Sequence, residues 1–381
     1  MVQQYFSALL LASIACSASA QSDPALDARR MELDKRYTIG PSAASELGYR
    51  IAWQSVVDEQ EGELVRVDVI GDDVYAIAPR NRLTRLTRDT GKPIWTSTVA
   101  DELDTVWGVT PGVPGSDGEF DRLYITTDPV VMEVDHATGA VVGRQDLDRI
   151  PSTDVLQYDN FLVFGTHSGQ VVWHQYLVGH AWRASQLLGP VTGTPIVVDG
   201  GDIAVGSLGG TVLVVDSRSA RRIWGKRLFD AVPTALAAGG GFVVAAGRDQ
   251  YVWAFDAGRG DLKWKYFTES PLTTSPTILG ENVLQWVPAK GLVCLELDPR
   301  DEIEGRVKWM IEDASGDVVG TINDDAVLFD TETRMLRIVD MAHGAIRTSI
   351  HLPKVRSLQF KGNEIYATGD GSHIQRLDPI R

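Results

Sequence analysis

Few side chains in this sequence have the types and spacing that metal binding requires. The seven histidines form no His-x-x-x-His or His-Glu-x-x-His pair, which would place two imidazoles on one helix face as zinc ligands. An acidic loop at 114–121 carries carboxylates, but it lacks the alternating Asp/Asn pattern of a calcium loop. We therefore predict no metal site, and we interpret the acidic loop as a solvated hairpin extension.

Motifs for covalent catalysis and phosphate binding are also missing. No Gly-x-Ser-x-Gly pentapeptide is present, and Gly91-Lys92 lacks the preceding glycine of a phosphate loop. The run 239–241 is three glycines before a strand rather than a helix, as expected for a tight turn. The two cysteines, Cys16 and Cys294, offer no disulfide framework. The sequence therefore predicts no catalytic residue and no bound cofactor.

The composition favours many short strands. Of 381 residues, 44% are apolar, which is enough for a full hydrophobic core. The 37 glycines and 17 prolines are scattered between short runs of Val, Ile, Leu and Trp, a pattern typical of strands joined by tight turns. The net charge of −15 is opposite in sign to the basic surface that a phosphate backbone requires, so we expect no nucleic-acid partner.

A motif ending in tryptophan repeats along the chain. The segments ending at Trp95, Trp224 and Trp264 have Thr or Asp eight positions before the indole and Gly or Ala four positions before it. With Gly143 and Thr348 standing in the tryptophan position of two further copies, the anchors lie 39 to 48 residues apart. Each interval contains about four strand-length runs, and four antiparallel strands per repeat make a propeller blade.

Six of the ten tryptophans occupy this single repeat position. A large flat side chain on the outermost strand can seal the gap between adjacent sheets. We therefore predict a structural role in docking one blade onto the next, rather than cofactor stacking, for Trp53, Trp95, Trp182, Trp224, Trp264 and Trp309.

The blade count follows from the two ends of the repeat region. The last repeat supplies only three strand-like runs before the chain stops at Arg381. A fourth is available around Trp53, and pairing it with the last repeat would leave no open sheet edge. The sequence predicts an all-β, eight-bladed propeller over 47–381, closed by its own first and last strands.

The N-terminus has the pattern of an exported protein. An apolar run at 6–16 and an Ala18-Ser19-Ala20 sequence predict a signal peptide over 1–20, although no basic residue precedes the run. Alternatively, Cys16 lies where a lipid-modified cysteine would lie, which would give peripheral membrane association. Residues 21–46 are polar and are interpreted as an exposed leader or tether. We expect no transmembrane segment and a periplasmic or cell-envelope location.

The repeat resembles that of a known family. The frame Ala-x-Asp-x-x-x-Gly-x-x-x-Trp at 254–264, with DTGKPIW at 89–95 and TTSPTILGENV at 273–283, is similar to the pyrroloquinoline-quinone (PQQ) type propeller repeat. The resemblance covers 47–381. The family includes quinoprotein dehydrogenases. Membership of that branch would imply an adjacent cysteine pair and calcium ligands, and this sequence has no adjacent cysteine pair.

In size and layout the chain is more similar to the BamB branch of that family. That resemblance implies a non-catalytic scaffold that binds protein partners, including outer-membrane β-barrel assembly components. It also implies a partner-binding loop at 185–190, where Leu187 and Leu188 are the candidate residues and the family's arginine is absent. Two alternatives stay open: a ligand-binding or sensor propeller, and a quinoprotein-like enzyme, both using the central channel.

Overall fold

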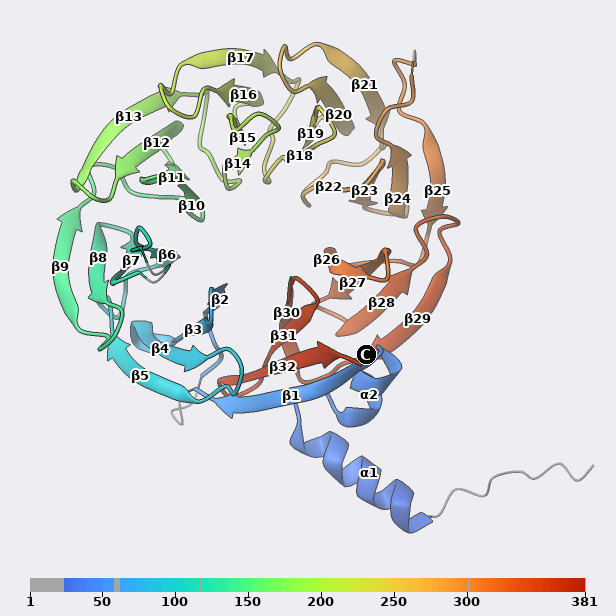
Figure 1. Ribbon diagram of the computed structural model, residues 1–381. Coiled ribbons are helices and arrows are strands. Elements are labelled where there is room, and N and C mark those ends of the chain that lie inside the picture. Colours follow the sequence, from blue (N-terminus) through green and yellow to red (C-terminus); the bar gives the residue numbers. More distant parts are fainter. Residues whose placement is uncertain (1–23, 58–61, 117, 119, 301, 381) are drawn as a thin grey trace, which may run out of the picture.

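The fold is a ring of eight four-stranded antiparallel sheets, as predicted (Figure 1). The computed structural model describes residues 24–57, 62–116, 118, 120–300 and 302–380. Two helices, α1 (Pro24–Arg36) and α2 (Pro41–Glu46), precede the ring. No helix in the described ranges is long and apolar enough to cross a membrane.

The strands follow the sequence in order, four to a blade. Blades 1 to 4 are formed by β2 (Arg66–Ile70), β3 (Asp73–Ala78), β4 (Arg82–Thr87), β5 (Pro93–Thr98); β6 (Val106–Pro111), β7 (Arg122–Thr127), β8 (Val130–Asp135), β9 (Val141–Asp146); β10 (Leu156–Tyr158), β11 (Phe161–Gly165), β12 (Gln170–Gln175), β13 (His180–Gln186); and β14 (Ile196–Val197), β15 (Ile203–Gly206), β16 (Thr211–Val215), β17 (Arg222–Arg227). A 3-10 turn, η1 (Pro79–Asn81), joins β3 to β4.

Blades 5 to 7 repeat the pattern and blade 8 uses both ends of the chain. They are formed by β18 (Ala237–Gly239), β19 (Phe242–Ala246), β20 (Tyr251–Asp256), β21 (Leu262–Phe267); β22 (Thr277–Leu279), β23 (Asn282–Val287), β24 (Gly291–Glu296), β25 (Val307–Ile311); β26 (Asp317–Ile322), β27 (Asp325–Asp330), β28 (Met335–Val339), β29 (Ile346–His351); and β30 (Val355–Lys361), β31 (Glu364–Gly369), β32 (His373–Pro379) with β1 (Tyr49–Val56).

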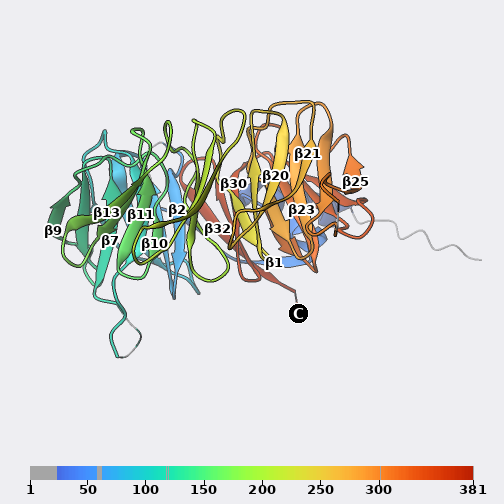
Figure 2. The ribbon, with the colours of Figure 1, turned by 90° about the horizontal axis from the view of Figure 1, so that it is seen from above.

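Each blade is apolar where neighbouring blades cover both of its faces. Every residue of β3, β15 and β19 is buried, and these strands lie second from the axis. The outermost strands, such as β5 and β9, alternate between exposed and half-buried residues because their outer edge meets solvent. The described residues of the segment between β6 and β7 project from one face of the ring, in line with the predicted hairpin extension (Figure 2).

The ring closes through its two ends. Strand β1 pairs antiparallel with β32, with Tyr49 opposite Pro379 and Val56 opposite His373. This pairing completes the four strands of blade 8 and pairs the outer edge of β32, as the sequence predicts. Figure 1 shows β1 along the outside of β32.

Indole side chains connect neighbouring blades. Five tryptophans donate their Nε1–H to a backbone carbonyl of the next blade at 2.7 to 3.0 Å, the pairs being Trp53 to Arg88, Trp95 to His136, Trp224 to Ala257, Trp264 to Leu297 and Trp309 to Met341. In four of these seams the indole lies against a glycine of the accepting turn. A Cβ atom on Gly91, Gly139, Gly260 or Gly344 would come within 2.4 to 2.6 Å of the indole ring.

The seam between blades 3 and 4 differs from this pattern. Ala220 takes the glycine position there, with a φ of 52°. Arg183 pairs with Trp173 as Trp224 pairs with Val214, so the strand register of blade 3 puts Arg183 rather than Trp182 in the tryptophan position, and Trp182 is 37% exposed. Trp182 stacks instead on Phe161, with ring centroids 5.2 Å apart, and under the Arg183 guanidinium at 4.6 Å. The structure therefore does not give Trp182 the docking role that the sequence predicts.

In the seam between blades 2 and 3, a glutamine replaces the tryptophan. Gly143 stands in the tryptophan position, and Gln145 donates its side-chain amide to the Tyr176 carbonyl at 2.6 Å. The polar link across this seam is thus kept without an indole.

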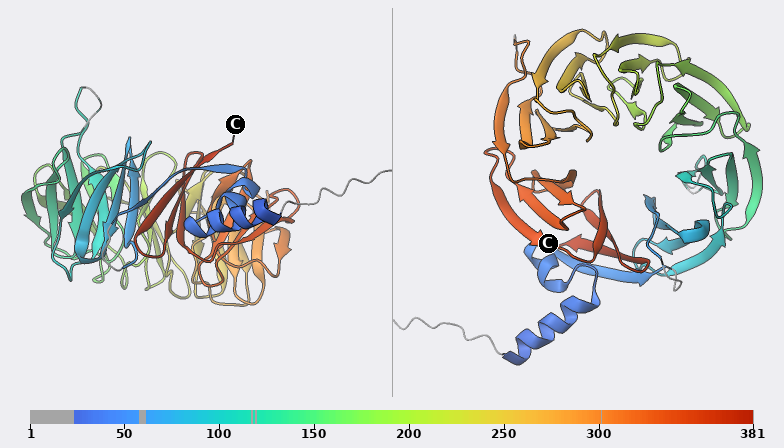
Figure 3. Two further views of the ribbon diagram at one scale, coloured as in Figure 1. Left: turned by 90° about the horizontal axis from the view of Figure 1, so that it is seen from below. Right: turned by 180° about the vertical axis from the view of Figure 1, so that it is seen from behind.

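The leader is only partly exposed, which corrects the prediction of a free tether up to residue 46. Helix α1 lies outside the ring (Figure 3), but Ile39 and Ala44 are buried against blades 7 and 8. The Gln375 side chain accepts from the Ile39 N–H at 2.7 Å and donates to its carbonyl at 2.9 Å. Residues 38–47 therefore cover apolar side chains of blades 7 and 8.

Candidate partner-binding surface

The two leucines predicted to bind a partner lie in different environments. Leu187 is 3% exposed and belongs to the core between blades 3 and 4. Leu188 is 52% exposed, in the loop that leads from β13 to blade 4. A small hollow of about 380 Å³ lies beside them, with Leu213 in its wall. Only Leu188 can therefore contact a partner, and the assignment of Leu187 to the binding surface is corrected to a core role.

Phe229 occupies the same place one blade further along, and the sequence interpretation missed it. The residues before Leu188 and Phe229 make the same backbone hydrogen bond, Leu187 to Gly169 and Leu228 to Gly210, each at 2.7 Å. Phe229 is 81% exposed. Alignment of the Leu-Leu pair with Leu228-Phe229 could have predicted both exposed side chains.

An aromatic cluster supports Phe229. Its ring lies 5.8 Å from that of Trp253, and Tyr251 lies 5.3 Å from Trp253 and 5.1 Å from Phe267. The Lys265 ammonium lies 4.9 Å from the Tyr251 centroid. Trp253 is buried while Phe267 is 49% exposed. We call Leu188, Phe229 and Phe267 the loop-face patch. Its exposed apolar groups on rigid supports are typical of protein-binding surfaces.

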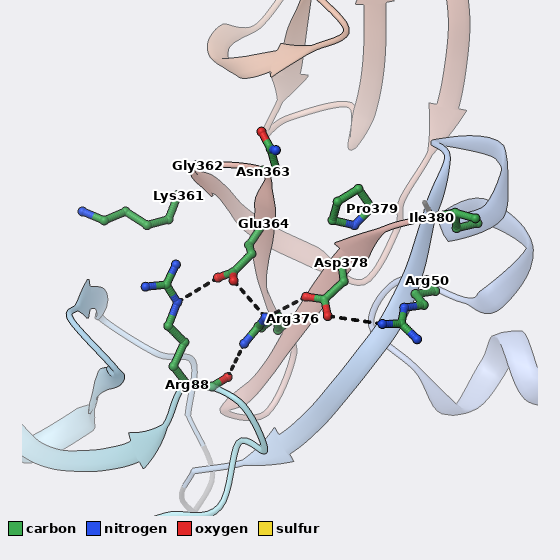
Figure 4. Close-up of a pocket in the computed structure, with 10 residues that line it drawn as sticks. All are labelled: Arg50, Arg88, Lys361, Gly362, Asn363, Glu364, Arg376, Asp378, Pro379 and Ile380. Carbon is green, nitrogen blue, oxygen red and sulfur yellow. Dashed lines mark hydrogen bonds and ion pairs between the residues drawn. The ribbon is translucent and has the colours of Figure 1, made fainter.

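A charged hollow at the ring closure has a structural explanation (Figure 4). The Arg376 guanidinium contacts Glu364 and Asp378, each at 2.8 Å, and the Arg88 carbonyl at 2.7 Å. Arg88 also pairs with Glu364 at 2.9 Å. These charges come from blade 1 and blade 8, so their mutual neutralisation links the first complete blade to the closing one.

Two buried titratable groups are kept neutral by their surroundings. Burial lowers the pKa of His174 to about 4, with the neighbouring His180 adding to the shift. Burial raises the pKa of the Cys294 thiol to about 12. Cys294 lies in the core between blades 6 and 7 and has no cysteine neighbour in the sequence. The chain therefore does not fit the cysteine pair that the quinoprotein resemblance implies.

The aspartates that recur at the same turn in four blades stabilise these turns. Asp216 Oδ1 accepts hydrogen bonds from the Ser219 N–H and hydroxyl, each at 2.6 Å, and these bonds lower the pKa of Asp216. Among the described residues, no three His, Cys, Asp or Glu side chains are grouped so as to hold a metal ion. Cys16, the candidate for lipidation, and the predicted signal peptide lie outside the described residues.

Comparison with known proteins supports the relationship suggested by the repeat. The profile of the family "Outer membrane protein assembly factor BamB" matches residues 160–379, which is more than half of the chain. The chain belongs to the BamB family. No curated protein sequence matches it significantly.

Solved structures share the fold of this BamB-family chain. The crystal structure of BamB from Moraxella catarrhalis has a TM-score of 0.65 and 15% identity, and the match covers 87% of this chain and 97% of that one. The computationally designed Ika8 protein gives a TM-score of 0.64 and 16% identity, covering 84% and 98%. At such identities the match shows the fold alone.

Proposed function

We propose that this BamB-family propeller is an exported, non-catalytic scaffold that binds protein partners in the cell envelope, including outer-membrane β-barrel assembly components. The observation that supports this best is the loop-face patch. Leu188 and Phe229 are 52% and 81% exposed, yet buried backbone and aromatic contacts fix their positions. Large apolar groups held rigidly at a surface lose little conformational entropy on binding.

The family relationship supports the choice of partner. The matching family is named for outer membrane protein assembly, and its profile covers blades 4 to 7, most of blade 3 and the three C-terminal strands of blade 8. The proposal extends that role to this chain and places the contact on the loop-face patch rather than in the central channel. We propose that the protein binds no PQQ.

Single aspartate substitutions in the loop-face patch test the proposal. In crosslinked pull-downs from envelopes, Leu188→Asp and Phe229→Asp should each lower recovery of β-barrel assembly proteins by about tenfold, because a buried carboxylate opposes the contact. Leu177→Asp is the matched control. Leu177 is 49% exposed but lies in the turn at the opposite end of β13, and its substitution should leave recovery unchanged.

Leu187→Asp has a different expected result. It places a carboxylate in the core, so it should lower the free energy of unfolding by roughly 3 kcal/mol or more, whereas Leu188→Asp should change it by less than about 0.5 kcal/mol. Equal recovery from wild type, Leu188→Asp and Phe229→Asp would refute the loop-face contact. Quinone-dependent dye reduction by the purified protein would refute the non-catalytic assignment.

A further inference from the structure

The outer rim carries a cationic groove at the seam between blades 3 and 4. It has a volume of about 740 Å³ and is lined by Arg183 from β13 and by Arg218 and Arg221 from the turn between β16 and β17. Asp216 is the one carboxylate among the residues that line the groove, and its Oδ1 accepts hydrogen bonds from Ser219. Figure 1 shows β13 and β17 side by side on the outside of the ring.

The three guanidinium groups are not neutralised by the protein. Arg183 donates to the Ser219 carbonyl at 3.2 Å, and none of the three forms an ion pair with another described residue. The corresponding turn of blade 5 behaves differently. Arg259 there pairs with Asp261 at 3.4 Å, and Lys263 pairs with Asp256 at 3.4 Å.

The groove stands beside the seam where Arg183 holds the position that a tryptophan holds in five other seams. Ala220 lines the groove, and the Arg183 guanidinium lies over the ring of Trp182. The site thus combines three arginines with a partly exposed indole. Arg and Trp are the residue types that contribute most at protein interfaces, and guanidinium forks match carboxylates with two hydrogen bonds.

We propose that this rim groove binds an extended acidic segment of a partner protein. The inference rests on the proposed scaffold function and adds a second contact to it, on the outer rim instead of the loop-face patch. The segment's carboxylates would pair with Arg218 and Arg221, and an apolar side chain would pack on Trp182.

The distribution of charged side chains on the outer rim favours binding of a narrow polypeptide over binding of an anionic membrane. A flat bilayer pressed on this rim would also meet the carboxylates of the blade 5 turn, including Asp256 and Asp261. A single extended chain in the groove contacts the free arginines without approaching those carboxylates. The long-range repulsion from a chain of this net charge would confine an acidic segment to the groove.

Binding of a fluorescein-labelled octaglutamate, followed by anisotropy at low ionic strength, tests the proposal. Arg218→Glu and Arg221→Glu should each weaken binding by at least about fivefold, because each replaces an attractive charge with a repulsive one. Arg259→Glu is the matched control, since it makes the same charge change in the blade 5 turn, and it should change the affinity by less than about twofold. Unchanged thermal unfolding would show that each variant is folded.

The proposal would be overturned if the wild type did not bind octaglutamate, or if Arg218→Glu bound it as tightly as the wild type does. It would also be overturned if the protein bound phosphatidylglycerol vesicles through Arg218 but did not bind octaglutamate. The pull-down with Leu188→Asp and Phe229→Asp is independent of this measurement. The pull-down therefore tests the scaffold function, and the anisotropy measurement tests binding in the rim groove.

Discussion

Replacing Trp264 by alanine should lower the free energy of unfolding by about 3–5 kcal/mol, the range for removing a large aromatic side chain from a core. The indole is fully buried and donates to the Leu297 carbonyl of the next blade at 2.8 Å. Its loss leaves a cavity between blades 5 and 6 and an unsatisfied carbonyl. The midpoint and slope of urea unfolding, followed by circular dichroism, would measure the change.

Trp182→Ala is the control for this prediction. It removes the same side chain from the outer strand of blade 3, but Trp182 lies one position before Arg183, the residue equivalent to Trp264, and is 37% exposed. Its loss should change stability by less than about 1 kcal/mol, as for a surface residue. Similar effects of the two substitutions would contradict the account of blade docking.

His174 should make the protein acid-sensitive. Its pKa is about 4 in the folded chain, below the ordinary value of 6.5, because the ring is buried. Above pH 6.5 the imidazole is neutral in both the folded and the unfolded state, so its titration does not change the free energy of unfolding. As pH falls from 6.5 to 4, only the unfolded state takes up the proton, so this group lowers stability by on the order of 3 kcal/mol in total.

A phenylalanine at this position should remove that part of the pH dependence. The two outer strand pairs of blades 3 and 5 each contain a β-bulge. Next to it His174 pairs with Ala181 in blade 3 and Phe255 pairs with Leu262 in blade 5, so Phe255 is the residue equivalent to His174. Urea unfolding of wild type and His174→Phe between pH 7 and 4 would give the difference. Parallel curves for the two proteins would show that His174 does not titrate in this range on unfolding.

The architecture could be predicted from the sequence because one physical rule recurs in several blades. An indole on the outer strand and a glycine in the next turn fit together, and Trp53, Trp95 and Trp224 show this at the predicted spacing. The closure was predictable because three strands at one end of the repeat region and one strand at the other together make one complete four-stranded blade.

The failures came from residues whose environment depends on the neighbouring blade. Leu187 and Leu188 are identical in type and adjacent, and only the blade 4 core decides that Leu187 is buried. The sequence interpretation aligned Trp182 by its indole, whereas the turn at Gly179 sets the register and puts Arg183, four positions later, in the tryptophan position. The docking of Ile39 depends on Gln375, which is distant in sequence.

Ring closure by β1 and β32 can be tested directly by disulfide cross-linking. Arg50 and Asp378 are paired across these strands, where Cα atoms lie within the distance that a disulfide spans. In a chain with Cys16 and Cys294 changed to serine, Arg50→Cys with Asp378→Cys should oxidise to an intramolecular disulfide in the monomer, identified by mass spectrometry of the linked peptides. The pair Arg50→Cys and Asp121→Cys, on blades 8 and 2, should not. Two free thiols in the first pair, or cross-links only between chains, would contradict closure of one chain upon itself.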